Sequence, residues 1–453
     1  MRIRTSTALA ALLAAGLTPL TLTAPASAAA AKYADDYNGD GYRDYAVYSY
    51  GPDGASRGGG VQVTFGTANG PGARTQFIDQ ASSGVPGADE SDDMFGEVRS
   101  PADFNADGYA DLAVAATGED VDGRKDQGAV TVLWGSATGL SGGTTVPNKA
   151  PRDSYSRMGS DLATGDFNGD GKKDLALVNA GKTYVYRGAV NRSGVHGSVT
   201  TLDKPSTSFY STAVVAGKVN GDGKTDLVVI GDVVSDSYIA SDAWFVKGGA
   251  TLTSGKTLRL ESVNGNGGEA DRGGDGVIAD FDKDGYGDIA VGTPLHSKYR
   301  GRVSVWYGGS AGPSASARFT QATGGVAGTP ETYDSFGDSV SAGDVNGDGY
   351  QDLAVGAYGE TIDGKEYAGG VHVLYGRAAG LTGTGSHWFA RNSAGVPGAL
   401  TADDSFGATV RLRGGALYVT GTEGALRLPG TSRGITSTGA VSAENDVIEG
   451  MLQ

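Results

Sequence analysis

Hydrophobic and polar residues alternate in short runs along most of the chain. Clear examples are residues 130–135 (VTVLWG), 303–308 (VSVWYG) and 371–376 (VHVLYG), each of which ends in an aromatic residue and a glycine. A period of two places alternate side chains on the same face of a β-strand. Shorter apolar runs without alternation, such as residues 353–355, predict buried strands. The pattern therefore predicts an all-β protein.

A nine-residue polar segment precedes the buried runs and recurs along the chain. Side chains with oxygen atoms occupy its third, fifth and ninth positions in every copy, and glycine occupies the sixth. A residue without Cβ makes the sharp backbone turn there at little cost. Five copies also begin with Asp and are complete: residues 36–44, 103–111, 166–174, 280–288 and 344–352. A sixth copy, residues 218–226, begins with Lys218.

The spacing of these oxygen atoms predicts calcium-binding loops. Calcium takes roughly six to eight oxygen ligands, whereas zinc and copper favour nitrogen and sulfur. We expect the backbone carbonyl of the seventh residue to join the side chains, so that the complete loops bind about five calcium ions. Ordinary Asx turns are the alternative interpretation. The predicted ligands are Asp36, Asn38, Asp40, Tyr42, Asp44, Asp103, Asn105, Asp107, Tyr109, Asp111, Asp166, Asn168, Asp170, Lys172, Asp174, Asp280, Asp282, Asp284, Tyr286, Asp288, Asp344, Asn346, Asp348, Tyr350 and Asp352.

Two details of the loops refine this prediction. An EF-hand would need a bidentate Glu at about the twelfth position and flanking helices, but all six copies have an apolar strand residue there, as at Val355. Lys218 either weakens the sixth copy as a metal site or places its ammonium where the cation would be, paired with Asp222 or Asp226. We favour the second interpretation and predict that this loop needs no metal.

The distances between loops predict the architecture. Successive copies begin 52 to 67 residues apart, which suits a four-stranded propeller blade better than a solenoid repeat. Phe406-Gly407 opens a seventh unit that has no polar loop. We therefore predict one domain over residues 29–453, a seven-bladed β-propeller of four-stranded blades with calcium-binding loops.

The units resemble FG-GAP repeats, the blades of the integrin α-subunit head. The resemblance is carried by Phe95-Gly96 and Phe336-Gly337 before the loops, and by small-residue endings such as residues 291–294 (VGTP) and 355–357 (VGA) after them. It implies calcium sites on one face of the propeller and ligand recognition on the opposite face. The first unit lacks Phe-Gly, and the chain is more similar to free-standing secreted bacterial propellers than to an integrin.

The ends and the composition of the chain predict where it works. Residues 1–28 read as a secretory signal peptide, with Arg2 and Arg4, an apolar stretch over 8–22 and the small residues 26–28. We expect a secreted, extracellular monomer without a membrane span. The net charge of −16 argues against nucleic-acid partners. The absence of cysteine excludes disulfides and thiolate metal sites. Asn191-Arg192-Ser193 is a glycosylation sequon, which has meaning only in a host that glycosylates.

Candidate catalytic residues are few. Residues 308–312 match the G-x-S-x-G pattern, but the same turn recurs at 135–139 and 376–380, so we predict a repeat turn rather than a nucleophile elbow. Of the four histidines, we expect His372 to be structural, whereas His296 stands in a predicted loop and is a candidate site residue.

The acidic connections on the predicted opposite face suggest a binding surface. Residues 84–93, 118–125 and 359–365 are rich in Asp and Glu, and Tyr299, Tyr333 and Tyr358 are nearby. Solvated acidic turns are the simpler explanation. We predict a binding or adhesion module for a carbohydrate or protein ligand rather than an enzyme. The alternative is an extracellular polysaccharide lyase or a hydrolase such as a phosphodiesterase.

Overall fold

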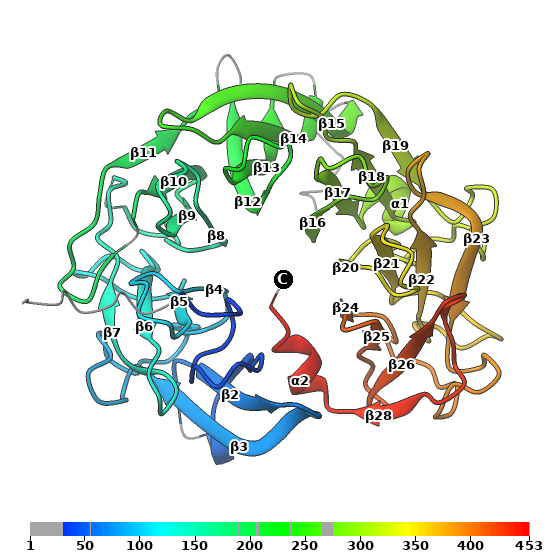
Figure 1. Cartoon of the computed structure of the whole chain (residues 1–453), viewed down its shortest axis with the longest axis horizontal. Coiled ribbons are helices and arrows are strands. Elements are labelled where there is room, and N and C mark those ends of the chain that lie inside the picture. Colours follow the sequence, from blue (N-terminus) through cyan, green and yellow to red (C-terminus); the bar gives the residue numbers. More distant parts are fainter. Residues whose placement is uncertain are drawn as a thin grey trace, which may run out of the picture.

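The chain folds into seven antiparallel sheets arranged around a central axis (Figure 1). The computed structural model describes residues 30–452 apart from 55, 152, 189, 205–207, 236–237 and 265–274, so the predicted signal peptide lies outside the described residues. Each sheet is one blade, and strands that are consecutive in sequence are neighbours in the sheet. The seven-bladed β-propeller is confirmed.

Blades 1 to 3 cover the first half of the chain. Blade 1 contains β1 (Tyr45–Ser49), β2 (Gly60–Thr67) and β3 (Gly70–Asp79), with the short 3-10 helix η1 (Pro52–Gly54) between β1 and β2. Blade 2 contains β4 (Arg99–Ala102), β5 (Asp111–Ala116), β6 (Ala129–Trp134) and β7 (Ser141–Thr145). Blade 3 contains β8 (Leu162–Gly165), β9 (Asp174–Asn179), β10 (Lys182–Tyr186) and β11 (Val199–Leu202).

Blades 4 to 6 repeat the four-stranded pattern. Blade 4 contains β12 (Phe209–Gly217), β13 (Asp226–Val234), β14 (Tyr238–Lys247) and β15 (Thr253–Asn264). Blade 5 contains β16 (Gly276–Ala279), β17 (Asp288–Thr293), β18 (Arg302–Trp306) and β19 (Ser316–Phe319), with α1 (His296–Tyr299) between β17 and β18. Blade 6 contains β20 (Val340–Gly343), β21 (Asp352–Ala357), β22 (Gly370–Tyr375) and β23 (Thr382–Phe389).

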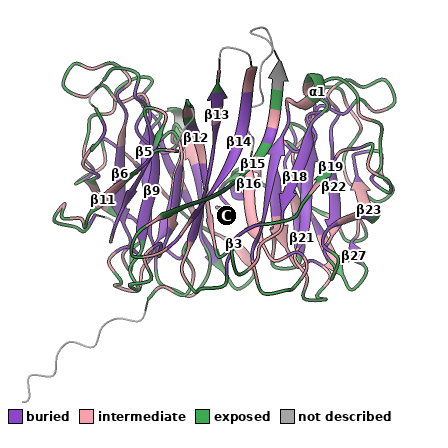
Figure 2. Cartoon of the chain, turned by 90° about the horizontal axis from the view of Figure 1, so that it is seen from above, coloured by how far each residue is buried: buried purple, intermediate pink, exposed green. Residues whose placement is uncertain are grey.

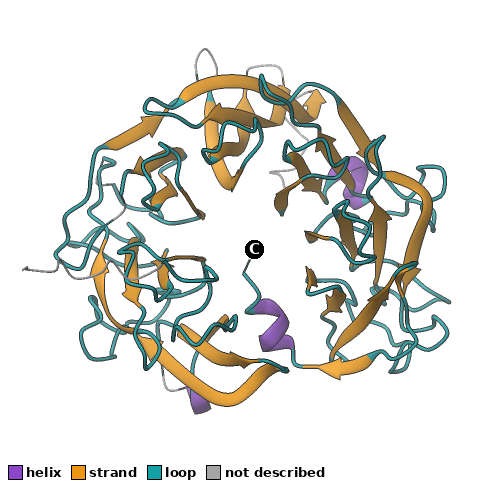
Figure 3. Cartoon of the chain, viewed as in Figure 1, coloured by secondary structure: helices purple, strands orange, loops and turns teal. Residues whose placement is uncertain are grey.

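Blade 7 and the first blade depart from four strands. Blade 7 contains β24 (Val410–Arg413), β25 (Ala416–Val419), β26 (Ala425–Thr431), β27 (Gly434–Ile435) and β28 (Val441–Ala443), and both β27 and β28 pair with β26. Five blades have the predicted four strands, whereas blade 1 has three in the described part of the chain. The helix α2 (Asn445–Glu449) follows β28 and lies between blades 1 and 7 (Figure 3).

The second strand of most blades is buried on both faces. All residues of β5, β9, β17 and β21 are buried, which agrees with their continuous apolar sequences. A blade is packed between two neighbours, so neither face of its central strands contacts water (Figure 2). Outer strands such as β7 are largely exposed. The apolar runs in the sequence thus mark the middle of each blade.

The second residue of each polar loop fills the seam to the next blade. Phe281 belongs to a buried cluster that includes Leu353 and Leu374 of blade 6. The same position is buried in every copy, and its side chain lies in the cluster shared with the following blade: Tyr37, Phe104, Phe167, Val219, Phe281 and Val345. Burying a large apolar side chain contributes roughly 1.5–3 kcal/mol. The loops therefore also hold the ring together.

The C-terminal segment closes the ring against blade 1. The backbone N–H of Ala46 in β1 donates to the carbonyl of Gly450 at 3.1 Å, and Val447 and Met451 pack on Tyr45. Arg411 of β24 donates to the Met451 carbonyl at 2.9 Å. Figure 1 shows α2 and the C-terminal end reaching toward the axis. The last residues of the chain thus occupy the inner edge of blade 1.

Among the described residues, no helix has the length and apolar character needed to cross a bilayer. This finding agrees with the absence of a second long apolar run in the sequence.

His372 in β22 is a neutral core residue, as predicted. It is fully buried between Phe336 and Trp388, with ring centroids 5.2 and 4.4 Å away. Burial lowers the pKa of this imidazole from 6.5 to about 3. The folded state therefore excludes a proton that the unfolded chain accepts below about pH 6.5.

We expect acid to destabilise the protein through this residue. Between pH 6.5 and 5 the unfolded state gains the proton and the folded state does not, so the unfolding free energy falls by about 2 kcal/mol. The variant His372→Leu should lack this component of the pH dependence. Urea unfolding of both proteins between pH 7.5 and 5 would measure it, and parallel pH curves would contradict the assignment.

Candidate metal sites

The six polar loops lie on one face of the ring. Five of them connect the first and second strands of a blade, and residues 36–44 lead directly into β1. We call this the loop face, and we call the other side, which carries the connections between second and third strands and between blades, the opposite face. Neighbouring loops contact each other: the N–H of Ala110 donates to the Asp36 carbonyl at 2.9 Å, and that of Gln351 to the Asp280 carbonyl at 3.2 Å.

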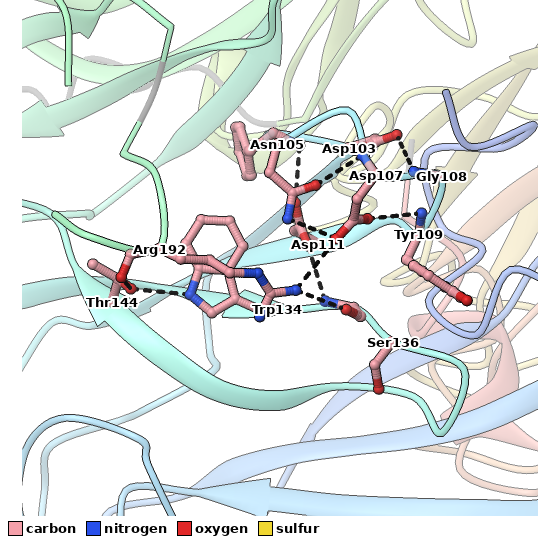
Figure 4. A network of polar contacts seen from close by, with 12 residues as sticks. Asp103, Asn105, Asp107, Gly108, Tyr109, Asp111, Trp134, Ser136, Thr144 and Arg192 are labelled. Carbon is pink, nitrogen blue, oxygen red and sulfur yellow. Dashed lines mark hydrogen bonds and ion pairs between the residues drawn. The ribbon is translucent and has the colours of Figure 1, made fainter. Parts of the chain in front are cut away.

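Within a complete loop, the predicted ligands are connected by short-range hydrogen bonds. In residues 103–111, Asp103 accepts the N–H groups of Asp107 and Gly108 at 3.2 Å each (Figure 4). Asn105 accepts the Asp107 N–H at 3.0 Å, and Asp107 accepts the Tyr109 N–H at 3.1 Å. The same pattern recurs in residues 36–44, 166–174 and 280–288. The N–H of the fifth residue donates to the side chains of the first and third residues, and the N–H of the seventh donates to the side chain of the fifth. In residues 344–352 the third and fifth residues again accept bonds of this kind, and Asp344 accepts from Gly347 and Gly349.

The ninth residue is a buried Asp with a structural role in all six loops. In the second loop, Asp111 accepts the N–H of Phe104 through Oδ2 and the N–H of Gly135 through Oδ1, both at 2.9 Å. Asp288 accepts equivalent bonds from Phe281 and Gly308 at 2.9 and 2.8 Å. This carboxylate connects the loop to the chain just after the third strand. Each oxygen has a further lone pair, so ligation of a cation is compatible with these bonds.

Negative charge accumulates in the loops. The pKa of Asp111 and Asp288 is raised to about 7, mainly by burial and also by nearby loop carboxylates, against backbone hydrogen bonds that lower it. The same causes raise the pKa of Asp44 to about 7 and that of Asp352 to about 6. A cation within the loop would stabilise the ionised form of each group.

The loop of residues 280–288 has the most complete set of carboxylates. Oxygen atoms of Asp280, Asp282 and Asp288 all lie within 4.8 Å of one another, a spacing that a single metal ion can bridge. The other four complete loops have Asn at the third position, and its amide Nδ2 donates to the fifth residue, as in the 2.9 Å bond between Asn105 and Asp107. The donor set is entirely oxygen and fits a divalent cation such as calcium.

The predicted pairing of Lys218 is wrong. Lys218 is exposed, and it makes no ion pair within the described residues, whereas Lys224 and Lys247 both approach Asp222 at 3.5 Å. Asn220 turns onto Asp226 and donates to it through Nδ2 at 3.0 Å. In this loop the amide Nδ2 of the third residue therefore donates to the buried ninth residue instead of the fifth, although Asn220 Oδ1 still accepts the backbone N–H of Asp222 at 2.9 Å. The lysines that approach Asp222 are the seventh residue of the loop, Lys224, and the last residue of β14, Lys247, and not the first residue of the loop.

Two contacts to the second loop come from distant parts of the chain. The N–H of Ala31 donates to Asp103 at 2.9 Å, which adds a third donor to that carboxylate. Arg192, from the connection between β10 and β11, reaches Asp107 at 3.3 Å and lies 5.0 Å over the Trp134 ring (Figure 4). Neither contact has a local sequence signal, because each depends on blades meeting in space.

The remaining candidate residues have clear positions. Residues 308–312 form a turn after β18, and the next element is the strand β19 rather than a helix, so the repeat-turn prediction is supported. His296, in α1, has its Nδ1 2.5 Å from Glu261 Oε2, and Arg302 lies 3.5 Å from the same oxygen. Asn191 is exposed, and its glycosylation stays a prediction.

The opposite face carries most of the left-handed non-glycine backbone. Such conformations are uncommon and cluster at functional positions. Tyr299 and Tyr333 are both left-handed, with φ of 61° and 79°, and their rings lie 5.3 Å apart. Sixteen further described residues have such a backbone. Ala106 and Lys283 lie on the loop face, and the others lie on connections of the opposite face: Asp92, Met94, Asp122, Asp126, Tyr155, Arg157, Ala180, Ser297, Lys298, Ser335, Asp363, Tyr367, Asp403 and Ser405.

Comparison with known proteins agrees with this architecture. The FG-GAP repeat model matches residues 95–133, 273–306 and 336–374, and an FG-GAP-like repeat model matches residues 166–229. The chain is an FG-GAP-repeat β-propeller.

The chain is also similar to parts of longer proteins. Integrin alpha-PS2 of Drosophila melanogaster is 30% identical over 220 residues, which cover 46% of this chain and 15% of that protein. Mouse integrin alpha-8 is 26% identical over 238 residues, covering 48% of this chain and 21% of that protein. Rat phosphatidylinositol-glycan-specific phospholipase D is 33% identical over 154 residues, which cover 30% of this chain and 18% of that protein. The aligned region is thus about a fifth or less of each relative.

We expect the ninth Asp to support the fold even without metal. In Asp226→Asn, one oxygen acceptor becomes an NH₂ group that faces a backbone N–H, which costs about 1–3 kcal/mol of unfolding free energy. The control Asp222→Asn removes only partly exposed ion pairs and should cost less than about 1 kcal/mol. Urea unfolding in a chelator would compare them, and equal losses would contradict the structural role of Asp226.

Proposed function

We propose that the protein is a secreted binding module whose loop face binds calcium and whose opposite face binds a carbohydrate or protein ligand. The five complete loops would each bind one calcium ion through the side chains of their first, third, fifth and ninth residues and the carbonyl of the seventh. The convergence of Asp280, Asp282 and Asp288 within 4.8 Å is the observation that supports the metal assignment most directly. The sixth loop would bind none, because Lys224 and Lys247 already pair with Asp222.

Calcium would supply positive charge that the loops lack. The ninth residue of each loop is buried, and its connection to the third strand makes the metal ligand part of the blade. The loop also inserts its second residue into the next seam and bonds to the next loop. Metal binding would therefore stabilise the junctions between blades rather than single turns.

The ligand-binding proposal is supported by the character of the opposite face. Tyr333 is 52% exposed and lies beside Tyr299, so the two rings present an aromatic surface. Glu331, which is exposed, is in the same connection. Aromatic rings with nearby acidic groups suit sugars and polar protein surfaces. The similarity to integrin α chains supports a binding role at the same coarse level.

An enzymatic role is the second candidate. Two observations favour it: the partial similarity to a phospholipase D, and the cluster of His296, Glu261 and Arg302, which lies outside the repeated positions. Within that cluster the carboxylate of Glu261 contacts both His296 and Arg302, which is typical of a structural network. Phosphodiester and polysaccharide substrates would test this candidate, and turnover lost in His296→Ala would favour it over the binding module.

Calcium removal should lower the melting temperature, because the ions bind the folded state only. Metal analysis after dialysis against calcium should show one ion fewer in Asp344→Ala than in the unchanged protein. The matched variant Asp222→Ala, at the fifth position of the sixth loop, should leave the ion count unchanged. A melting temperature that does not respond to chelation, together with an unchanged count in Asp344→Ala, would contradict the proposal.

Ligand binding should depend on the opposite face. On glycan and protein arrays, we expect Tyr333→Ala to lower retention of a ligand about tenfold or more, since it removes half of the aromatic surface. Tyr42→Ala is the matched control, because Tyr42 is exposed on the loop face and would contribute only its backbone carbonyl to a metal. Equal binding by both variants would place the ligand elsewhere.

A further inference from the structure

Three connections on the opposite face are internal copies of one another. Residues 80–96, 321–337 and 391–407 each lead from the last strand of one blade to the Phe-Gly of the next, and they align without a gap. Their backbones form the same turn: the N–H of Val85, Val326 and Val396 donates to the carbonyl three residues earlier at 3.1, 2.9 and 3.0 Å. The copies can therefore be compared position by position.

Each copy contains a buried carboxylate that meets a Glu from the next blade. Asp93, Asp334 and Asp404 are at most 2% exposed. The backbone carbonyl of each Asp accepts an N–H from the connection between the second and third strands of the next blade, at 3.0, 3.2 and 2.7 Å respectively. This bond places the Glu of that connection beside the Asp. We call the resulting groups the first, second and third acid sites: Gln80, Asp93 and Glu119; Gln321, Asp334 and Glu360; Arg391, Asp404 and Glu423.

The third acid site contains its own cation. Arg391 donates to Asp404 through Nε at 2.8 Å, and both side chains are at most 1% exposed. Its Nη1 donates to the Pro397 carbonyl at 3.1 Å, and its Nη2 donates to the Gly424 carbonyl. The guanidinium thus neutralises the buried carboxylate and uses carbonyl oxygens of the surrounding turns.

The first and second acid sites have no such cation. Gln80 and Gln321 take the place of Arg391, and each donates Nε2 to the Glu of its site at 2.5 Å. Asp93 and Asp334 form no ion pair with the described residues. The two copies also carry Glu90 and Glu331 where the third has Thr401. Two of the three copies are therefore more negative and lack the compensating charge.

Each of these two sites also has a buried acceptor without a partner. The Oε1 atoms of Gln80 and Gln321 have no hydrogen-bond donor among the described residues, although the two side chains are only 6% and 3% exposed. Gly328, with φ of 88°, lies against the second site: a Cβ there would be 3.0 Å from Gln321 Nε2 and 3.6 Å from Glu360 Oε1. The Gln321 amide nitrogen and the Glu360 carboxylate therefore meet beneath this turn, and a cation bound there would require the amide to rotate so that its oxygen replaces Nε2 beside the carboxylate.

The titration behaviour of the acids agrees with a missing cation. Burial raises the pKa of Asp93 and Glu360 to about 7, with the neighbouring acid of the same site as a further cause. Burial raises the pKa of Asp334 to about 6, although the guanidinium of Arg300, which forms no ion pair with it, lowers this pKa. Without a cation these groups must either remain close together while charged or take up protons.

We propose that the first and second acid sites each bind a calcium ion, at the place that the Arg391 guanidinium fills in the third. The ligands are the carboxylates of Asp93 and Glu119 with the amide oxygen of Gln80, and the equivalent atoms of Asp334, Glu360 and Gln321. Two carboxylates and an amide oxygen form a hard, doubly negative donor set that favours calcium. These sites lie on the opposite face and are additional to those proposed for the loops.

Exchanging the differing residues between copies tests this proposal. The double variant Gln321→Arg/Glu331→Thr gives the second site the composition of the third. After dialysis against calcium chloride, metal analysis should show one ion fewer per chain than in the unchanged protein. The reverse exchange, Arg391→Gln/Thr401→Glu, should add one ion per chain. The two variants serve as controls for each other, because they exchange the same residue types in the same turn.

The possible outcomes separate a cation from protons. If Gln321→Arg/Glu331→Thr folds and its ion count is unchanged, the acids are neutralised by protonation rather than by a cation, and the proposal is overturned. The single variant Glu360→Gln covers the case in which the exchange does not fold, and it too should lower the count by one. The loop sites are tested separately by Asp344→Ala. If the loop proposal fails, the differences in ion count between the exchange variants and the unchanged protein still test the acid sites.

Discussion

A single buried carboxylate in each of six blades positions both the fold and the proposed metal sites. The ninth residue of every polar loop accepts one hydrogen bond from the start of the loop and one from a later part of the same blade. In five blades the second donor follows the third strand, as Gly135 does for Asp111, and in blade 1 it is Gly66 within β2. These bonds fix the loop relative to two strands. They also direct the second loop residue into the seam with the next blade, so loop geometry and ring packing depend on the same interaction.

The seams of the ring are not equivalent. Six of them contain large apolar clusters, whereas the cluster at the seam between blades 7 and 1 is small and, in the described part of the chain, consists of Tyr45, Val447 and Met451. Polar contacts supplement it: Arg413 reaches Asp35 at 2.7 Å, across 378 positions of sequence. Blade 7 has no polar loop, and its first two strands are joined at Gly414 and Gly415. The closure of the ring therefore depends on the two ends of the chain.

The two faces combine the same repeat with different chemistry. On the loop face, hydrogen bonds between neighbouring loops and backbone turns keep the acidic residues close together. On the opposite face, left-handed residues such as Tyr299 and Tyr333 fix exposed side chains in place, and buried acids gather beneath the connections. Because the units are copies, a residue that differs between them indicates what a position requires. Arg391 shows this for the acid sites.

The sequence by itself determined the strand pattern, the number of blades, the polar loops and the structural role of His372. These features follow from local periodicity and from residues that are close in the chain, which is why a repeat reveals them. Only the tertiary structure decided that Lys218 is exposed, that Arg192 reaches Asp107, that α2 closes blade 1 and that Asp93 meets Glu119. Each of those contacts joins segments from different turns or blades. Their existence depends on how the sheets pack around the axis, and no local pattern of side chains encodes that packing.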